Sequence, residues 1–438
     1  MVIHAAFKSN AARPGSAPAG ATPRDQSAQL EEAVALSGAI HLDIVEAMTV
    51  PVSKPVPATL MGSGKVEEIR ALIEQCRAEL VIVNVSLTPV QQRNLETAWN
   101  AKVLDRTALI LEIFGERAVT REGRLQVELA HLTYQRSRLV RSWTHLERQR
   151  GGFGFLGGPG ETQIETDRRL IGERIAKLRK ELGEVKRTRG LHRQARARVP
   201  FPIVALVGYT NAGKSTLFNM LTKAEVAAKD LLFATLDPTM RALVLSNGRK
   251  LILSDTVGFV SELPIQLVAA FRATLEEVLE ADLILHVRDA AHADSEAQKS
   301  DVVDVLSELG IEEDSDRPII EVLNKIDLLE PDIRESILAR NEARPDGAIA
   351  VSALSGAGIA DLLVSLEHHL GARDHLFILR LKSEDGAGLA WAYANGRVVE
   401  RNDQDLEITL TVSADDKTVE KFRNYYSERP SAEIEFNH

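Results

Sequence analysis

The sequence predicts an α/β protein built from several domains, and three observations carry this prediction. The chain has 438 residues, more than one hydrophobic core usually organises. Apolar β-type runs alternate with helical runs from about residue 38 to 118, which is typical of a mostly parallel sheet. Further on, the buried-strand pattern PIVALVG at 202–208 leads through a loop into a helical run, so a second α/β unit follows the first.

The N-terminal part divides into a tail and a small domain. Residues 1–30 are rich in Ala, Pro, Ser and Gly and have no periodic apolar pattern, so we expect a disordered tail. The alternating runs place an N-terminal α/β domain at 31–124. Within it, GSGK at 62–65 resembles part of a phosphate-binding loop, but Val66 stands where a metal-binding hydroxyl would be required. We interpret it as a turn that opens a helix.

Residues 125–199 are expected to form a basic, antiparallel helical hairpin. Two apolar stripes have helical spacing, one made of Leu125, Leu129, Leu132, Leu139, Trp143 and Leu146, the other of Ile171, Ile175, Leu178, Leu182 and Val185. From residue 134 to 200 there are 17 Lys and Arg against 7 Asp and Glu, a surplus of +10 in a chain whose net charge is −10. Such a segment is typical of a surface that meets a phosphate backbone, and a solvated basic helix face is the alternative.

The two stripes are joined by GGFGFLGGPG at 151–160, in which Phe153 and Phe155 stand among glycines. These rings could stack on the bases of an RNA, or they could fold back on the helices. Both interpretations stay open.

The composition argues against a membrane protein. The longest apolar runs, such as FPIVALV at 201–207, are too short to span a bilayer, and no secretory signal or lipid-anchor motif is present. The one cysteine, Cys76, cannot form an internal disulfide, which suits a reducing compartment. We therefore expect a cytoplasmic protein without a membrane anchor, and a monomer.

A phosphate-binding loop lies at 208–216. GYTNAGKST matches G-x-x-x-x-G-K-[ST] between a predicted strand and a predicted helix. Gly208 and Gly213 allow successive backbone N–H groups to surround a β-phosphate. Lys214 would span the β- and γ-phosphates, and the Ser215 hydroxyl would ligate Mg²⁺. The pattern predicts a P-loop domain at 200–371 that binds a nucleotide with Mg²⁺ as cofactor.

The motifs that follow have the order of a nucleotide switch. Thr235, in LLFATLDPT, can close onto the metal and the γ-phosphate, Asp255 supplies a carboxylate near the metal, and Gly258 can offer its N–H to the γ-phosphate. Asp327, in NKID, can accept from both N1–H and the exocyclic amine of guanine. Adenine would leave this carboxylate unpaired at a cost of about 1–3 kcal/mol, so we expect GTP rather than ATP.

The candidate residues form four groups. The nucleotide-binding candidates are Gly208, Tyr209, Thr210, Asn211, Ala212, Gly213, Lys214, Ser215, Thr216, Phe233, Ala234, Thr235, Leu236, Asp237, Asp255, Thr256, Val257, Gly258, Asn324, Lys325, Ile326, Asp327, Ser352, Ala353 and Leu354. Ser215 and Thr235 are the metal-ligand candidates, and Lys214, Thr235 and Gly258 are the catalytic candidates. The RNA-contact candidates are Arg136, Arg138, Arg141, Phe153, Phe155, Arg168 and Arg169.

Three residues depart from what their positions lead us to expect. In small switch GTPases a glutamine that orients the attacking water usually follows the glycine of this motif, and Phe259 can neither donate nor accept a hydrogen bond. We expect slow hydrolysis by the free protein, stimulation by a docked partner, and a Phe259 ring packed against that partner. His286 is interpreted as a packed core residue rather than a substitute catalyst. Arg288 stands in a strand where an apolar residue is expected.

The motifs FATLDPT, DTVGF, NKID and SAL, preceded by GGFGFLGGPGETQIETDRR, closely resemble those of the HflX family within the Obg-HflX group of translation GTPases. The resemblance covers about residues 38–371 and also explains Phe259, because the family carries an apolar residue there. It implies binding to the large ribosomal subunit and its ribosomal RNA, and GTP-dependent splitting of stalled or idle ribosomes. A large-subunit assembly GTPase, or a nucleotide-gated RNA-binding or unwinding protein with ATP on its N-terminal domain, stays open as an alternative.

Residues 372–438 are expected to form a small C-terminal α+β module in which strands precede a terminal helix, and no chemistry is assigned to it. The complete prediction is an N-terminal α/β domain with an antiparallel helical hairpin, a P-loop GTPase domain and this module.

Overall fold

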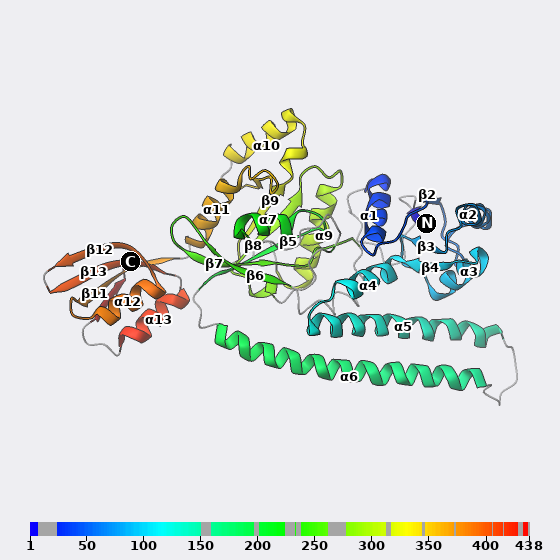
Figure 1. Cartoon of the computed structure of the whole chain (residues 1–438), viewed down its shortest axis with the longest axis horizontal. Coiled ribbons are helices and arrows are strands. Elements are labelled where there is room, and N and C mark those ends of the chain that lie inside the picture. Colours follow the sequence, from blue (N-terminus) through cyan, green and yellow to red (C-terminus); the bar gives the residue numbers. More distant parts are fainter. Residues whose placement is uncertain are drawn as a thin grey trace.

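Three sheets and a long helical hairpin make up a computed structural model of the chain. It describes residues 1–7, 24–149, 159–196, 201–223, 233, 238–261, 277–311, 317–343, 347–371, 374–404, 406–414, 416–427 and 432–436. The N-terminal and C-terminal domains lie at opposite ends of the P-loop domain, and the hairpin runs along one side (Figure 1). The predicted fold class is confirmed.

The N-terminal domain is a parallel sheet of order β2-β1-β3-β4 with helices on it. Its elements are β1 (Val2–Phe7), α1 (Gln26–Gly38), β2 (Ala47–Val52), α2 (Ser63–Cys76), β3 (Leu80–Val83), α3 (Pro89–Trp99), β4 (Lys102–Asp105) and α4 (Arg106–Arg117). The helix α2 begins directly after Gly62, so the interpretation of GSGK as a helix-opening turn is confirmed.

The prediction of a disordered tail is wrong for both described ends of residues 1–30. Residues 2–7 form the inner strand β1, and α1 begins at Gln26; residues 8–23 lie outside the described residues. β1 pairs with β2 on one side and β3 on the other, and Ile3 is fully buried. Both partner strands come after α1 in the sequence, so local composition could not reveal this pairing.

The hairpin consists of α5 (Arg121–Gln149) and α6 (Pro159–Arg196), which lie side by side (Figure 1). Their buried seam contains Leu125, Leu178 and Leu182, with Leu129, Leu132 and Val185 packed against it, as the stripes predict. Asp105 at the end of β4 anchors α5 to the N-terminal domain, because its carboxylate accepts hydrogen bonds from the Tyr134 hydroxyl, at 2.7 Å, and from Arg138.

The P-loop domain has a sheet of order β10-β9-β8-β5-β7-β6, parallel except for β6 against β7. Its elements are β5 (Ile203–Gly208), α7 (Lys214–Thr222), β6 (Thr239–Val244), β7 (Lys250–Asp255), β8 (Leu283–Asp289), α9 (Ser295–Glu308), β9 (Ile319–Asn324), η1 (Ile326–Leu328), α10 (Pro331–Ala343), β10 (Ile349–Ala350) and α11 (Ile359–Gly371). Parallel pairing brings the carboxyl ends of β5, β8 and β9 to one edge of the sheet, where ligands bind in open α/β folds.

Strand β8 carries two polar residues in its buried centre. His286 is buried, and burial lowers its pKa to about 4 against the opposing effect of Glu321, so the interpretation as a neutral core residue is supported. Arg288 is also buried and pairs with Glu321 and with Glu296, at 2.6 Å in the latter case. Two carboxylates thus pair with the charge of the arginine that looked out of place in the sequence.

The C-terminal module is an antiparallel sheet of order β12-β13-β11-β14 with two helices. Its elements are β11 (His375–Lys382), α12 (Gly386–Asn395), β12 (Arg397–Gln404), β13 (Glu407–Ala414), α13 (Asp416–Ser427) and β14 (Ala432–Phe436). The expectation that strands precede a terminal helix needs correction, because β14 follows α13 and pairs with β11.

Within the described ranges, none of the helices combines the length and the apolar character that a membrane span requires.

Candidate functional site

The phosphate-binding loop follows β5 and has two glycines that no other residue could replace without a clash. Gly208 and Gly213 have φ values of +151° and +89°. A Cβ on Gly208 would overlap the carbonyl oxygen of Val287 in β8, and a Cβ on Gly213 would overlap the side-chain amide of Asn324. The loop therefore lies against the ends of β8 and β9, at the edge that parallel pairing predicts.

Lys214 begins α7 and is buried inside this loop. Its Nζ donates to the carbonyl oxygens of Gly208, at 3.0 Å, and Tyr209, at 2.7 Å. Burial lowers the pKa of Lys214 to about 8, and the Asp255 carboxylate opposes this shift. An anionic phosphate beside the ammonium group would act in the same direction as Asp255 and favour the charged form.

Of the two residues expected to hold Mg²⁺, Ser215 lies at the start of α7 beside Asp255, and Thr235 lies outside the described residues. The Ser215 hydroxyl donates to Oδ2 of Asp255 at 2.7 Å, and Asp255 at the end of β7 is fully buried. A hydroxyl next to a carboxylate is a hard-oxygen donor set, which fits Mg²⁺. The next residue, Thr256, is tied to β5, because its hydroxyl donates to the Leu206 carbonyl at 2.5 Å.

The Asn324 side chain connects three motifs of the nucleotide site. Its Nδ2 donates to the Ala212 carbonyl at 2.8 Å, and its Oδ1 accepts from the Ala353 N–H at 2.9 Å. NKID, the phosphate-binding loop and SAL are thus connected through one buried amide. Asp327 in η1 is exposed, as a carboxylate that recognises a base must be before binding.

Other members of these two motifs have different roles. Lys325 forms an ion pair with Asp289 at 2.8 Å. Ile326, Ser352 and Ala353 are buried and shape the loops, whereas the Leu354 side chain is 79% exposed.

The segment with Gly258 and Phe259 pairs with the phosphate-binding loop. The Phe259 N–H donates to the Gly208 carbonyl at 3.0 Å, and the Thr210 N–H donates to the Phe259 carbonyl at 2.7 Å. A Cβ on Gly258 would lie 2.9 Å from the Thr210 Cα and 3.0 Å from the Lys214 Nζ. Gly258 therefore lies beside the lysine that is expected to contact the γ-phosphate.

The expected position of the Phe259 ring is wrong in this structure. The side chain is 1% exposed and belongs to the apolar cluster between the P-loop domain and the N-terminal domain. Its ring is covered by the protein's own residues, so it is not presented to a docked partner.

Phe233, the first residue of the FATLDPT motif, lies in the same cluster. Its ring meets that of Phe114 in α4 edge-on, with centroids 4.6 Å apart. It thus packs against the N-terminal domain. Ala234, Thr235, Leu236 and Asp237 lie outside the described residues.

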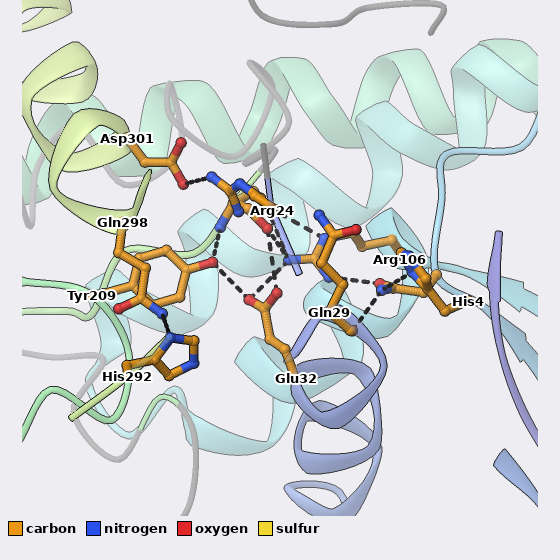
Figure 2. Close-up of polar contacts among 11 residues, drawn as sticks. His4, Arg24, Gln29, Glu32, Arg106, Tyr209, His292, Gln298 and Asp301 are labelled. Atoms are coloured by element: carbon orange, nitrogen blue, oxygen red, sulfur yellow. Dashed lines mark hydrogen bonds and ion pairs between the residues drawn. The ribbon is translucent and has the colours of Figure 1, made fainter. Parts of the chain in front are cut away.

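Tyr209 has a contact that sequence reasoning missed. Its hydroxyl donates to Oε1 of Glu32 in α1 at 2.8 Å (Figure 2). It also accepts from the Ser261 N–H at 2.7 Å. Arg106 from the N-terminal domain reaches the same place. Glu32 and Arg106 carry no motif, and only the packing of two domains reveals them.

The RNA-contact candidates on the hairpin divide into three groups. Arg168 and Arg169 on α6 are exposed, and Arg136 on α5 is half-buried. Arg138 is engaged inside the protein with Asp105 and the Leu87 carbonyl, so we no longer count it as a candidate. Phe153, Phe155 and the Arg141 side chain lie outside the described residues.

Family models match most of the chain in three consecutive regions. A GTP-binding GTPase N-terminal model matches residues 27–115, a GTP-binding GTPase middle-region model matches 117–196, and a 50S ribosome-binding GTPase model matches 203–325. The third region contains the phosphate-binding loop, Asp255 and Asn324.

Curated relatives agree with this match. The chain is 52% identical to GTPase HflX of Magnetococcus marinus over 407 residues, covering 93% of this chain and 92% of the relative. It is 45% identical to GTPase HflX of Escherichia coli K12, covering 82% of each. A solved GTP-binding protein from Sulfolobus solfataricus in complex with GDP is 24% identical, covers 84% of this chain and 98% of its own, and has a TM-score of 0.43. On the two curated relatives and the nucleotide site, the chain belongs to the HflX family of GTPases, which bind and hydrolyse GTP.

Proposed function

We propose that this GTPase binds the large ribosomal subunit and its ribosomal RNA, and uses GTP to split stalled or idle ribosomes. The observation that carries the proposal is the exposed basic face of α6. Six basic side chains of α6 are exposed, Arg168, Arg169, Lys177, Arg179, Lys180 and Arg187, whereas Ile175, Leu178 and Leu182 of the same helix are buried.

Several of these cations are available for a partner. Among the described residues, Arg168, Arg179, Lys180 and Arg187 form no ion pair, while Arg169 and Lys177 have exposed pairs at 3.8 Å and 4.0 Å with Glu173 and Glu181. Exposed pairs at such distances are weak and exchange readily for a phosphate. The description of the matching P-loop model as a 50S ribosome-binding GTPase supports the same partner.

At the nucleotide site, each group has a proposed task. The Lys214 ammonium binds the β- and γ-phosphates, and the Gly258 N–H donates to the γ-phosphate as charge develops there. Ser215, with Thr235, holds Mg²⁺, and Asp255 orients the Ser215 hydroxyl. When bound there, Mg²⁺ would supply positive charge against the phosphates. Asp327 selects guanine.

The proposed reaction depends on order in the segments around the γ-phosphate. Phe259 cannot orient water, so backbone groups must be held in place for GTP to be cleaved at a useful rate. Docking on a large subunit would fix these segments from outside. We therefore propose slow hydrolysis by the free protein, which acts as a cytoplasmic monomer, and stimulation by ribosomes.

Sucrose-gradient sedimentation of purified ribosomes tests the proposed splitting. With GTP or a non-hydrolysable analogue, the protein should convert intact ribosomes to separate subunits and co-sediment with the large one, and with GDP it should not. An unchanged ribosome peak in all three nucleotide states would contradict splitting. If cells that lack the protein instead accumulate large-subunit precursors, the assembly function is indicated.

A charge-reversed variant links this outcome to α6. Arg168→Glu with Arg169→Glu should abolish co-sedimentation but leave GTP binding unchanged, because both side chains lie on the hairpin. Arg334→Glu with Lys382→Glu makes the same change in net charge at two exposed positions of other domains and should behave like the unmodified protein. Equal loss in both variants would point to overall charge rather than to a surface on α6.

A further inference from the structure

The helix α4 of the N-terminal domain meets both segments that follow the phosphate-binding loop in the chain. Leu109, Ile110, Ile113 and Phe114 of α4 share one buried cluster with Phe233, Val257, Phe259 and Val260. The cluster gives the N-terminal domain a fixed apolar contact beside the nucleotide site. Apolar packing alone, however, does not determine where individual backbone N–H groups point.

A buried polar network orients the backbone at Ser261, two residues after Phe259. The Arg106 guanidinium donates from Nη2 to the Ser261 hydroxyl at 2.8 Å and to its carbonyl oxygen at 3.1 Å. The Ser261 N–H donates to the Tyr209 hydroxyl at 2.7 Å. Every backbone polar group of Ser261 is thus held by a side chain from another element.

Glu32 closes this network (Figure 2). Its Oε1 accepts from the Tyr209 hydroxyl at 2.8 Å and from Arg106 Nη2 at 3.1 Å. Arg106 is 3% exposed and Tyr209 5%, so the charges and the hydroxyl are shielded from water. Asn84 fixes the other side of the guanidinium by accepting from Nη1 at 2.6 Å. In such surroundings hydrogen bonds are directional and costly to break.

The network is connected to the catalytic groups through a short stretch of backbone. Tyr209 is the second residue of the phosphate-binding loop, and its carbonyl accepts from Lys214 Nζ at 2.7 Å. Ser261 is separated from Gly258 by two residues, and Phe259 between them is paired with Gly208 and Thr210. A shift of Ser261 would therefore move the Gly258 N–H relative to Lys214.

We infer that Tyr209 and Arg106 are positioning residues for GTP hydrolysis: they hold Ser261 so that the Gly258 N–H stays beside Lys214, where the γ-phosphate charge develops. The inference rests on the proposed assignment of Lys214 and Gly258 to the γ-phosphate. Since Phe259 supplies no hydrogen bond to water, the rate depends on how well these backbone donors are preorganised. The N-terminal domain thus contributes to the rate of a reaction in another domain.

Steady-state GTP hydrolysis by the full-length protein without ribosomes tests this inference. Tyr209→Phe removes only the hydroxyl and should lower kcat by roughly three- to tenfold while KM for GTP stays within about twofold, because the lost contact acts on the transition state. Arg106→Gln should lower kcat at least as much. Arg106→Lys, which keeps a cation but not the guanidinium fork, should give an intermediate kcat.

Tyr426→Phe is the matched control. The Tyr426 hydroxyl is equally buried and donates to the Gly388 carbonyl at 2.7 Å in the C-terminal module, so this variant loses the same kind of bond and should keep kcat. Thermal unfolding of each variant identifies any that fails to fold. If an Arg106 variant does not fold, Tyr209→Phe alone tests the inference, because it removes one hydroxyl and keeps the ring.

An unchanged or increased kcat in folded Tyr209→Phe, or a change confined to KM, would overturn the inference. Lys214→Ala, measured in parallel for GTP binding, reports separately on the site assignment. Since no ribosome is present, the result does not depend on whether the protein splits ribosomes.

Discussion

Asn324 Nδ2 donates to the Ala212 carbonyl at 2.8 Å and so ties the guanine-side motif to the phosphate-binding loop. The same amide accepts from the Ala353 N–H at 2.9 Å. Asn324 is 1% exposed, so no water can replace either bond.

Asn324→Ala should therefore weaken the binding of GTP and GDP alike. Two buried backbone groups lose their partners, at a cost of about 1–3 kcal/mol each. Because part of this cost should fall on the nucleotide-bound state, we expect a roughly 10- to 100-fold loss in affinity. Titration with a fluorescent guanine nucleotide measures it. Asn395→Ala removes a comparable bond, to the Trp391 carbonyl at 2.9 Å in the C-terminal module, and should leave both affinities unchanged.

Lys214→Ala or Ser215→Ala should abolish tight GTP binding in Mg²⁺ buffer. The first removes the buried ammonium group of the phosphate-binding loop, and the second removes the hydroxyl beside Asp255. Isothermal titration compares the two. The Ser215→Ala defect should shrink when Mg²⁺ is chelated, since both proteins then lack the metal, whereas the Lys214→Ala defect should persist. Undiminished affinity in either variant would show that the site is assigned wrongly.

Asp327→Asn should change the base preference from guanine to xanthine. The carboxylate is exposed in η1, which follows β9, and can accept from two donors of guanine, while an amide can donate to the C2 carbonyl of xanthine. Competition between GTP and XTP for the variant measures the change. Asp332→Asn, at the exposed start of α10, is the control. The assignment fails if XTP competes no better for Asp327→Asn than for the unmodified protein.

Motifs with fixed spacing made the nucleotide site predictable. The P-loop, NKID and SAL each follow a buried strand, and parallel strands bring their carboxyl ends to one edge, so Lys214 and Asn324 could be placed together from the sequence. The hairpin seam was predictable for the same reason, because helical spacing places Leu178 and Leu182 on one face.

Contacts between distant elements could not be predicted in this way. β1 is a strand because β2 and β3 flank it, and β14 is a strand because β11 offers its edge. The contact of Tyr209 with Glu32 joins a loop to a helix that precedes it by 177 residues, and no local pattern encodes it. The burial of Phe259 was not predicted because the apolar cluster that contains it includes residues of another domain.

His286 should make the stability of the P-loop domain depend on pH. Its pKa is lowered to about 4 by burial, whereas a histidine in the unfolded chain has a pKa of 6.5. The folded state therefore binds fewer protons, so the stability that it contributes is present above about pH 6.5 and is lost as the pH falls toward 4. By about pH 5 the loss should reach roughly 2 kcal/mol.

Urea unfolding at neutral and acidic pH checks this expectation. His286→Gln should remove that part of the pH dependence, and His41→Gln, whose side chain is 71% exposed, should not. Glu321 and Arg288 also lie near His286, but the pKa of Glu321 is lowered by its hydrogen bonds with Lys299 and Arg288, and the pKa of Arg288 is raised by its bonds with Glu296 and Glu321, so both shifts lead away from this range. Equal pH dependence in all three proteins would contradict the assignment.

The last prediction concerns what holds the segments around the γ-phosphate in their catalytic arrangement. If a docked large subunit supplies it, single-turnover GTP cleavage should be accelerated roughly tenfold or more by large subunits, and much less by small subunits, relative to the free protein. The acceleration should fall steeply with added salt, because the exposed cations of α6 release counterions when they meet RNA. Since the Phe259 ring is buried in the cluster that the P-loop domain shares with α4, Phe259→Leu should preserve most of the acceleration. Phe259→Ala should leave a cavity in that cluster and destabilise the fold by about 3–5 kcal/mol. A loss of acceleration in Phe259→Leu with normal basal cleavage would instead mean that the ring leaves the cluster and reaches the partner. Equal cleavage rates with large subunits, with small subunits and with neither would end the hypothesis, because the catalytic order would then be complete within the chain itself.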